Sequence, residues 1–341
     1  MLHFDSDYME GACPEIMERL METNREQTPG YTFDKWSKSA RARIRKACGC
    51  PEAKVHFMVG GTQTNKVVIA SILSPCEGVV AAVSGHINQH ETGAVEATGH
   101  KVIPLPQTDG KLLAPALEEF MQAYSADDGK VHLVRPGMVY ISHPTEYGTL
   151  YTKAELTALS EVCRRYHLPL YLDGARLGYG LVADGTDVTL EDVASLCDVF
   201  YIGGTKVGAL FGEAVVVTHP GLARDLPPIM KSSGALLAKG RLLGIQFDTL
   251  FTDGLYLEIS RNAIRTAGIL AEGFRSKGYR FLVEPQTNQL FVILDDDTMA
   301  ELKKHATFTF WEKTDASHTA VRFATSWATR EEDVRALISL L

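Results

Sequence analysis

The chain has 341 residues, 45% of them hydrophobic, and its 34 Lys and Arg against 42 Asp and Glu give a formal net charge of -8. This length can bury a large core and predicts about two domains, while the acidic balance argues against nucleic acid as a partner. The six cysteines show no CxxC pair and no metal-ligand spacing with histidine, so we expect free thiols and no metal. No stretch reaches the roughly 20 apolar residues that span a bilayer, and a cytoplasmic protein is expected.

Extended and helical segments alternate from about residue 35 onward. This alternation predicts an α/β fold, with a mainly parallel sheet flanked by helices on both faces. The predicted helices are 35–48, 62–73, 90–98, 115–124, 153–166 and 190–196. The predicted strands are 55–59, 79–83, 138–142, 170–172, 199–202 and 214–217.

The pattern changes after a Gly- and Leu-rich helical stretch at 234–251. The elements expected beyond it are helix 255–277, strands 281–283 and 289–294, helix 299–305, strand 320–324 and helix 330–341. We therefore expect an N-terminal arm at 1–12, a large α/β domain over 13–245 and a small C-terminal α+β domain over 246–341.

Two charged residues stand in glycine-containing turns after predicted strands. Asp173 lies in LYLDGARLG and Lys206 lies in VFYIGGTKVG. A pyridoxal phosphate enzyme needs a lysine amine that condenses with the cofactor aldehyde, and a carboxylate that keeps the pyridine nitrogen protonated. Either residue alone is typical of a surface lysine or a turn. Together they predict a pyridoxal phosphate site.

A third segment fits the same interpretation. Gly60-Gly61-Thr62 follows a predicted strand and opens a predicted helix. The first N–H groups of a helix have no acceptor within it, and the helix dipole adds positive potential at the same place. We expect the cofactor phosphate there.

The sequence resembles the threonine aldolase and β-eliminating lyase branch of the fold type I pyridoxal phosphate enzymes, over most of its length. The matching segments, in chain order, are Phe4-Asp5-Ser6-Asp7, Gly60-Gly61-Thr62, His86 to Glu91, Asp173-Gly174-Ala175-Arg176, Thr205-Lys206 and Val321-Arg322-Phe323. The resemblance implies a sheet of the seven-stranded type in the large domain. It also implies a homodimer or homotetramer, in which a second subunit completes each site.

Cofactor contacts follow from the resemblance residue by residue. Gly61, Thr62 and Gln63 match the loop that holds the phosphate, and Thr205 is a second phosphate contact or orients the backbone. His86 matches the histidine that stacks on the pyridine ring. An imidazole there can also exchange a proton with the substrate hydroxyl.

Substrate contacts are implied in the same way. Arg322 resembles the arginine that clamps the substrate carboxylate, and Ser6 resembles its hydroxyl partner. Arg176 stands three residues after Asp173, where it can reach either the ring oxygen or the carboxylate. A planar guanidinium suits two-point binding of a carboxylate.

Four further residues match positions at the subunit interface of the family. Tyr31 resembles an aromatic residue that reaches the neighbouring subunit's site. Lys231, Lys239 and Arg241 lie where the family places a basic contact to phosphate, and the sequence does not choose among them.

One departure concerns a second histidine that aldolases of this family commonly carry. Aligned through Thr145, Glu146 stands in its place, and His143 is shifted three residues toward the N-terminus. His86, Glu146 and His143 therefore all remain candidates for the base at the substrate hydroxyl, with His86 preferred.

The resemblance implies retro-aldol cleavage of the Cα–Cβ bond in a β-hydroxy-α-amino acid, threonine or allo-threonine, to glycine and an aldehyde. The alternative is a β-eliminating lyase or other chemistry at Cα. A non-catalytic binding protein on the same fold would lack a cofactor bound covalently to lysine.

Overall fold

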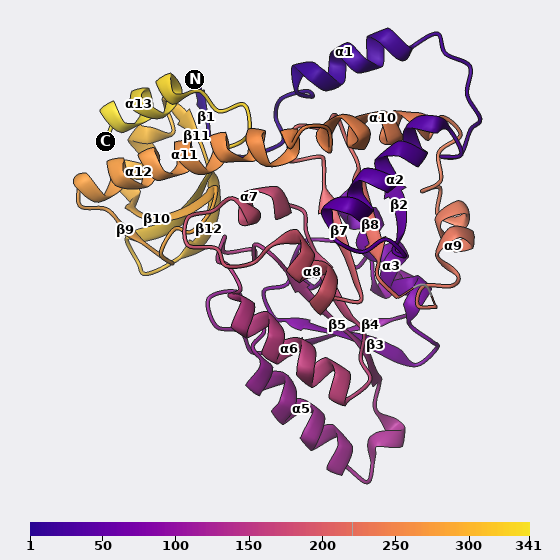
Figure 1. Ribbon diagram of the computed structural model, residues 1–341. Coiled ribbons are helices and arrows are strands. Elements are labelled where there is room, and N and C mark those ends of the chain that lie inside the picture. Colours follow the sequence, from indigo (N-terminus) through magenta and orange to yellow (C-terminus); the bar gives the residue numbers. More distant parts are fainter. Residues whose placement is uncertain (220) are drawn as a thin grey trace.

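The computed structural model describes residues 1–219 and 221–341, and a seven-stranded sheet lies at its centre (Figure 1). Within this sheet, as far as the described residues show it, β8 is the one strand that runs antiparallel to both neighbours. The predicted mainly parallel α/β sheet is thus confirmed. In spatial order the strands are β2 (Lys54–Met58), β8 (Glu213–Val217), β7 (Val199–Gly203), β6 (Leu170–Asp173), β5 (Arg135–Ser142), β3 (Glu77–Ala82) and β4 (Lys101–Leu105).

The central strands are apolar on both faces because helices cover both. Successive residues of β7 alternate between two cores, with Phe200 and Ile202 in one and Val199 and Tyr201 in the other. Helices α3 (Gly61–Ile72) and α9 (Leu226–Ser232) pack on the Val199 side. The opposite face is covered by α2 (Lys35–Ala47), α5 (Ala114–Ala126), α6 (Lys153–Arg165), α8 (Leu190–Leu196) and α10 (Arg241–Leu250).

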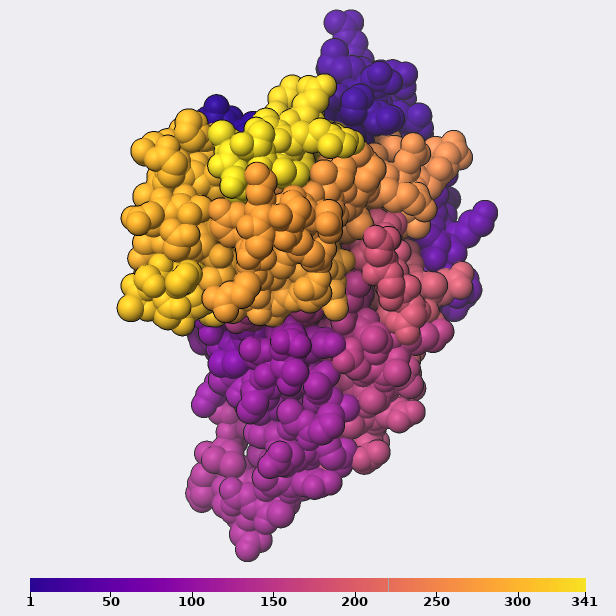
Figure 2. Space-filling view, turned by 90° about the vertical axis from the view of Figure 1, so that its left-hand side faces the viewer, coloured from indigo at the N-terminus to yellow at the C-terminus, as the bar shows by residue number. Residues whose placement is uncertain are grey.

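A second, antiparallel sheet is formed by the C-terminal part of the chain. Its strands are β12 (Thr309–Lys313), β13 (His318–Ala324), β10 (Gln289–Asp295) and β9 (Arg280–Phe281). The long α11 (Leu255–Ser276) and the last helix α13 (Glu331–Ser339) share a core with it, built around Phe274 and Phe323. Figure 2 shows this orange and yellow part as a block above the magenta part.

The N-terminal segment runs between the two sheets. It begins as β1 (Leu2–His3), parallel to β11 (Ala306–Thr307), and Phe4 is buried in the C-terminal core. Further along, Cys13 N donates to Gly208 O at 2.8 Å, immediately before α1 (Pro14–Thr23). Residues 5–12 therefore cross from one sheet to the other and bring Asp7 between them.

Some predicted elements differ from the structure. The helix expected at 90–98 is wrong, because Thr92 and Gly93 take positive φ angles of 52° and 71°, which end any right-handed helix. A short α4 (His86–Gln89) precedes this turn, a 3-10 turn (Glu96–Thr98) follows it, and α12 (Asp296–Leu302) begins three residues earlier than expected. Strands β1, β4, β11 and β12 were not predicted, and neither were helices α1, α7 (Leu177–Leu181) and α9. The three domain limits stay a prediction.

No helix in the described part of the chain is both long enough and apolar enough to cross a membrane. Within the same residues, no cluster of three or more His, Cys, Asp or Glu side chains is arranged to hold a metal ion.

Candidate active site

Asp173 and Lys206 lie at the same edge of the large sheet. Asp173 ends β6, Lys206 follows β7, and these strands are parallel neighbours, so the loops after them lie side by side. A Cβ atom on Gly203 would lie 2.3 Å from Ala175 O, so only glycine permits this close approach of the two loops.

Two adjoining cavities open at this edge. The first, of about 260 Å³, is lined by both Asp173 and Lys206. The second, of about 610 Å³, extends to the C-terminal sheet and is lined by Arg322 and Trp311. The residues that line both cavities are Tyr8, His86, Glu146, Arg176 and Lys206.

Asp173 is a buried carboxylate surrounded by donors. Its Oδ2 accepts from Tyr140 Oη at 2.7 Å and Asn65 Nδ2 at 2.9 Å, and its Oδ1 accepts from Tyr201 Oη at 2.5 Å. Burial alone would raise the pKa of Asp173, but the charge of His86 and these three donors together hold it below its ordinary value. The side chain therefore stays ionised and can keep a ring nitrogen protonated.

Asn65 joins this carboxylate to His86. Its Nδ2 also donates to Glu91 Oε1 at 2.7 Å, and the same oxygen lies 2.8 Å from His86 Nδ1. The sequence interpretation missed Asn65, although a polar residue among the apolar positions of helix 62–73 was a usable signal. The contact between Glu91 Oε1 and His86 Nδ1 fixes the orientation of the imidazole and leaves its Nε2 for another partner.

The amine of Lys206 is easily deprotonated. Burial, assisted by the positive charge of Arg176, lowers the pKa of Lys206 to about 8. A neutral amine is the form that attacks an aldehyde, so this environment suits a lysine that forms a covalent bond with a cofactor.

Glu213, also missed by the sequence interpretation, organises the turn before Lys206. Its carboxylate accepts from Gly204 N at 3.1 Å and Thr205 Oγ1 at 2.8 Å, and Thr205 Oγ1 in turn accepts from Gly212 N at 2.9 Å. Burial raises the pKa of Glu213. Because the Thr205 hydroxyl already has a donor and an acceptor, the geometry favours its backbone-orienting role over a phosphate contact.

The N-terminus of α3 faces the first cavity through Gly60, Gly61 and Thr62. The N-cap Gly60 makes no side-chain cap, and no heavy atom lies within 4 Å of where its Cβ would be, so the approach is open. Gln63 does not line the cavity; its Oε1 accepts from Val59 N at 3.2 Å and stabilises the turn. An anion would meet the free N–H groups of the first turn here.

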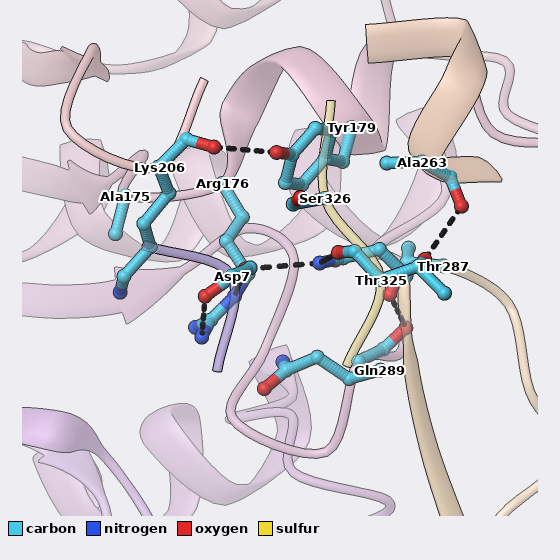
Figure 3. Close-up of polar contacts among 12 residues, drawn as sticks. Asp7, Ala175, Arg176, Tyr179, Lys206, Ala263, Thr287, Gln289, Thr325 and Ser326 are labelled. Carbon is cyan, nitrogen blue, oxygen red and sulfur yellow. Dashed lines mark hydrogen bonds and ion pairs between the residues drawn. The ribbon is translucent and has the colours of Figure 1, made fainter. Parts of the chain in front are cut away.

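Arg176 is held inside the protein by Asp7. Its Nε donates to Asp7 Oδ2 at 2.6 Å and its Nη2 donates to Oδ1 at 2.9 Å, while Asn288 Nδ2 donates to the same Oδ2 at 2.9 Å (Figure 3). Burial would raise the pKa of Asp7, but Arg176 and Lys206 outweigh it and lower the pKa to about 2. Arg176 lines both cavities, yet this ion pair uses two of its three nitrogens.

Arg322 lies on β13 and borders the second cavity. Its Nη2 donates to Asp5 O at 3.0 Å and its Nη1 donates to Gln289 Oε1 at 3.3 Å. Ser6 is the next residue after Asp5, and its buried hydroxyl has no partner among the described residues. The structure thus places Ser6 beside Arg322.

The two alternative bases have different surroundings. Glu146 lines both cavities, and its Oε1 accepts from His86 N at 2.8 Å and Ser142 Oγ at 2.6 Å. Burial raises the pKa of Glu146. His143 is fully buried, lines neither cavity and accepts from Tyr151 N at 3.3 Å. The geometry favours Glu146 over His143.

The four residues matched to the subunit interface line neither of these cavities. Lys231 Nζ lies 4.3 Å from the ring centroid of the exposed Tyr31, and Lys239 is exposed. Arg241 donates from its guanidinium to the backbone oxygens of Thr23 and Glu26. Their predicted role needs a second subunit and stays a prediction.

A lysine amine and an ionised carboxylate share one cavity, and a helix N-terminus opens into it. These groups fit pyridoxal phosphate, and with the seven-stranded sheet they define the fold type I class of enzymes that use it.

Comparison with known proteins narrows the class. The chain matches the β-eliminating lyase family over residues 3–328 and belongs to that family. It is 30% identical to the low specificity L-threonine aldolase of Pseudomonas aeruginosa over 98% of this chain and 95% of that protein. The corresponding Escherichia coli enzyme is 25% identical over 73% of this chain and 72% of its own.

Solved structures agree with this assignment. A threonine aldolase from Leishmania major is 40% identical, with a TM-score of 0.94 over 100% of this chain and 98% of that one. An aspartate aminotransferase from Thermus thermophilus, 16% identical with a TM-score of 0.69 over 100% and 90%, shares the fold.

Proposed function

We propose that this protein is a pyridoxal phosphate-dependent aldolase that cleaves threonine or allo-threonine to glycine and acetaldehyde. The observation that carries the proposal is the shared cavity of Lys206 and Asp173, with His86 and Glu146 beside them. Relatives named as threonine aldolases, which match nearly the whole chain, support this choice within the family.

The chain's own residues would hold the cofactor at three points. Lys206 would bond to its aldehyde carbon, Asp173 would pair with the ring nitrogen, and the first turn of α3 after Gly60 would receive the phosphate. When bound, pyridoxal phosphate supplies an electron sink for the pair left at Cα as the Cα–Cβ bond breaks. His86 would lie against the ring.

The substrate hydroxyl must lose its proton as the aldehyde forms. His86 is suited to accept it, because Glu91 fixes Nδ1 and Nε2 remains available on a cavity wall. Glu146 lies next to His86 and has a raised pKa, so it can exchange a proton with the imidazole or the substrate.

Product analysis tests the function. Purified protein with added cofactor should convert threonine and allo-threonine to glycine and acetaldehyde in equal amounts. Ammonia and a keto acid from serine, cysteine or aromatic amino acids, with no glycine, would instead support a β-eliminating lyase. A protein with no visible absorbance and no borohydride-reducible adduct would support a binding protein.

A cytoplasmic homodimer or homotetramer is part of the proposal. Phe33 is 81% exposed and Tyr31 is 40% exposed, which leaves apolar surface near the position where the family has its subunit interface. Light scattering after size exclusion should give twice or four times the chain mass.

A further inference from the structure

Three buried hydrogen-bonding atoms around Arg322 have no partner among the described residues. They are Ser6 Oγ, Gln289 Nε2 and Arg322 Nε. All three can donate a hydrogen bond, and buried donors left unsatisfied are costly and uncommon. Three on neighbouring segments indicate a site for an acceptor that the protein does not itself supply.

The fold brings these donors together. Phe291 on β10 pairs with Arg322 on β13, and Gln289 lies two residues before Phe291, so Gln289 and Arg322 share one face of the sheet. The contact from Arg322 Nη1 to Gln289 Oε1 sets the orientation of the amide and leaves Nε2 pointing elsewhere. Ser6 is adjacent because Asp5 O accepts from Arg322 Nη2.

Arg322 forms no direct ion pair among the described residues. The described hydrogen bonds of Arg322 go to the neutral acceptors Asp5 O, Gln289 Oε1 and Thr309 Oγ1. Arg176, by contrast, is already neutralised by the two-point contact with Asp7. In the second cavity, the arginine charge that is not already paired with a carboxylate is therefore that of Arg322, and an entering substrate carboxylate would meet it there.

Gln289 faces the same space as the catalytic groups. It lines the second cavity together with Arg322, Arg176 and Lys206. In Figure 3 its side chain extends in the direction of the Asp7–Arg176 pair, and its Oε1 accepts from Arg322 Nη1, a residue that the figure does not label. An amino acid bound in this cavity would therefore border both Lys206 and Gln289.

We propose that Gln289 is a specificity-determining residue, which donates through Nε2 to the α-carboxylate of the substrate beside Ser6 and Arg322. Arg176 is a positioning residue held by Asp7, and it does not provide a second two-point clamp. This inference rests on the proposed function, and it adds a donor that the sequence interpretation did not include.

Ligand binding tests it without turnover. Glycine and methylamine both present an amine to the holoenzyme, but only glycine has a carboxylate, and the change in visible absorbance gives each Kd. Gln289→Met should weaken glycine about 10-fold, as expected for one hydrogen bond to a charged group, and leave methylamine within twofold. Gln289→Glu should weaken glycine further, because it places an anion beside the carboxylate.

Gln122→Met is the matched control, because Gln122 lies on α5, lines neither cavity, and its amide already donates to Glu118 Oε1 at 3.0 Å. Its glycine Kd should equal that of the wild type. An unchanged glycine Kd in Gln289→Met, or an equal loss for methylamine, would overturn the proposal. If Gln289→Met does not fold, Gln289→Asn, which keeps the amide but shortens its reach, must show the selective loss of glycine affinity.

The experiments distinguish a failure of the Gln289 proposal from a failure of the proposed aldolase function. A wild-type protein that binds glycine through Gln289 but does not cleave threonine would refute the aldolase and leave this carboxylate site standing. A protein that cleaves threonine with an unchanged glycine Kd in Gln289→Met would refute only the site.

Discussion

Asp7 and Arg176, 169 residues apart in sequence, form a buried two-point ion pair at the junction of the two sheets. Asn288, which immediately precedes β10, joins the same carboxylate at 2.9 Å. The N-terminal segment thereby connects the loop after Asp173 to the C-terminal sheet, so the geometry of the site depends on residues from three distant parts of the chain.

Replacing Asp7 should therefore destabilise the protein. Asp7→Asn leaves the Arg176 guanidinium unpaired in a buried position, which typically costs about 3–5 kcal/mol. Urea denaturation measures the change in the free energy of unfolding. A double variant, Asp7→Asn with Arg176→Met, should recover part of the loss because no unpaired charge remains. Equal stability of Asp7→Asn and wild type would contradict the prediction.

The same pair predicts a dependence of stability on pH. The pKa of Asp7 is lowered from 3.8 to about 2, so its stabilising contribution is fully present above about pH 4 and is lost as the pH falls toward 2. The difference in stability between wild type and Asp7→Asn should shrink over this window. A difference that is constant from pH 5 to 2 would refute the assignment of this acid sensitivity to Asp7.

Lys206→Ala should abolish both cofactor attachment and turnover. No other residue is expected to supply the amine, so borohydride treatment should leave no reduced adduct in the mass of the variant. Lys277→Ala, at an exposed position after α11, serves as the control and should behave like the wild type. An adduct retained by Lys206→Ala would overturn the assignment.

The rate of cofactor capture by the apoprotein should depend on pH. Because the pKa of Lys206 is lowered to about 8, the neutral amine becomes dominant above that pH, and capture should speed up from pH 6.5 to about 8.5 and then level off. Stopped-flow absorbance measures this rate. A rate that continues to rise tenfold per unit up to pH 10 would indicate an unperturbed lysine.

Asp173→Asn should keep the shape of the site but remove the charge that holds a proton on the ring nitrogen. We expect turnover to fall by about 10²- to 10³-fold, the usual cost of losing a preorganised electrostatic contact. Glycine should still bind with a similar visible change, because Lys206 is intact. Wild-type turnover in this variant would exclude the role proposed for Asp173.

The roles of His86 and Glu146 can be separated by single substitutions. His86→Phe keeps an aromatic ring for stacking but cannot carry a proton, so kcat should fall about 10²- to 10⁴-fold while the cofactor stays bound. Glu146→Gln retains an oxygen to accept from Ser142 and His86 N, and we expect a smaller loss. If Glu146→Gln loses more kcat and flattens the pH profile, then Glu146 is the base.

Sequence patterns alone determined the class of fold, and they predicted Asp173 and Lys206 as the centre of the candidate site. The strand and helix repeats predicted the mainly parallel sheet, because helix-covered parallel strands are apolar along their whole length, as in Val199 to Ile202. Asp173 and Lys206 were identified because a cofactor of this kind needs both groups, and each follows a strand. Such requirements are local in sequence, so they can be recognised without coordinates.

Only the tertiary structure decided how the polar groups are partnered. The ion-pair partner of Arg176 is not one of the acidic residues near it in sequence. The partner is Asp7, which reaches Arg176 only because the N-terminal segment runs between the two sheets. Asn65, Glu213 and Gln289 depend in the same way on contacts between distant segments. Residues far apart in sequence become partners through chain packing, and local periodicity contains no record of which of them meet.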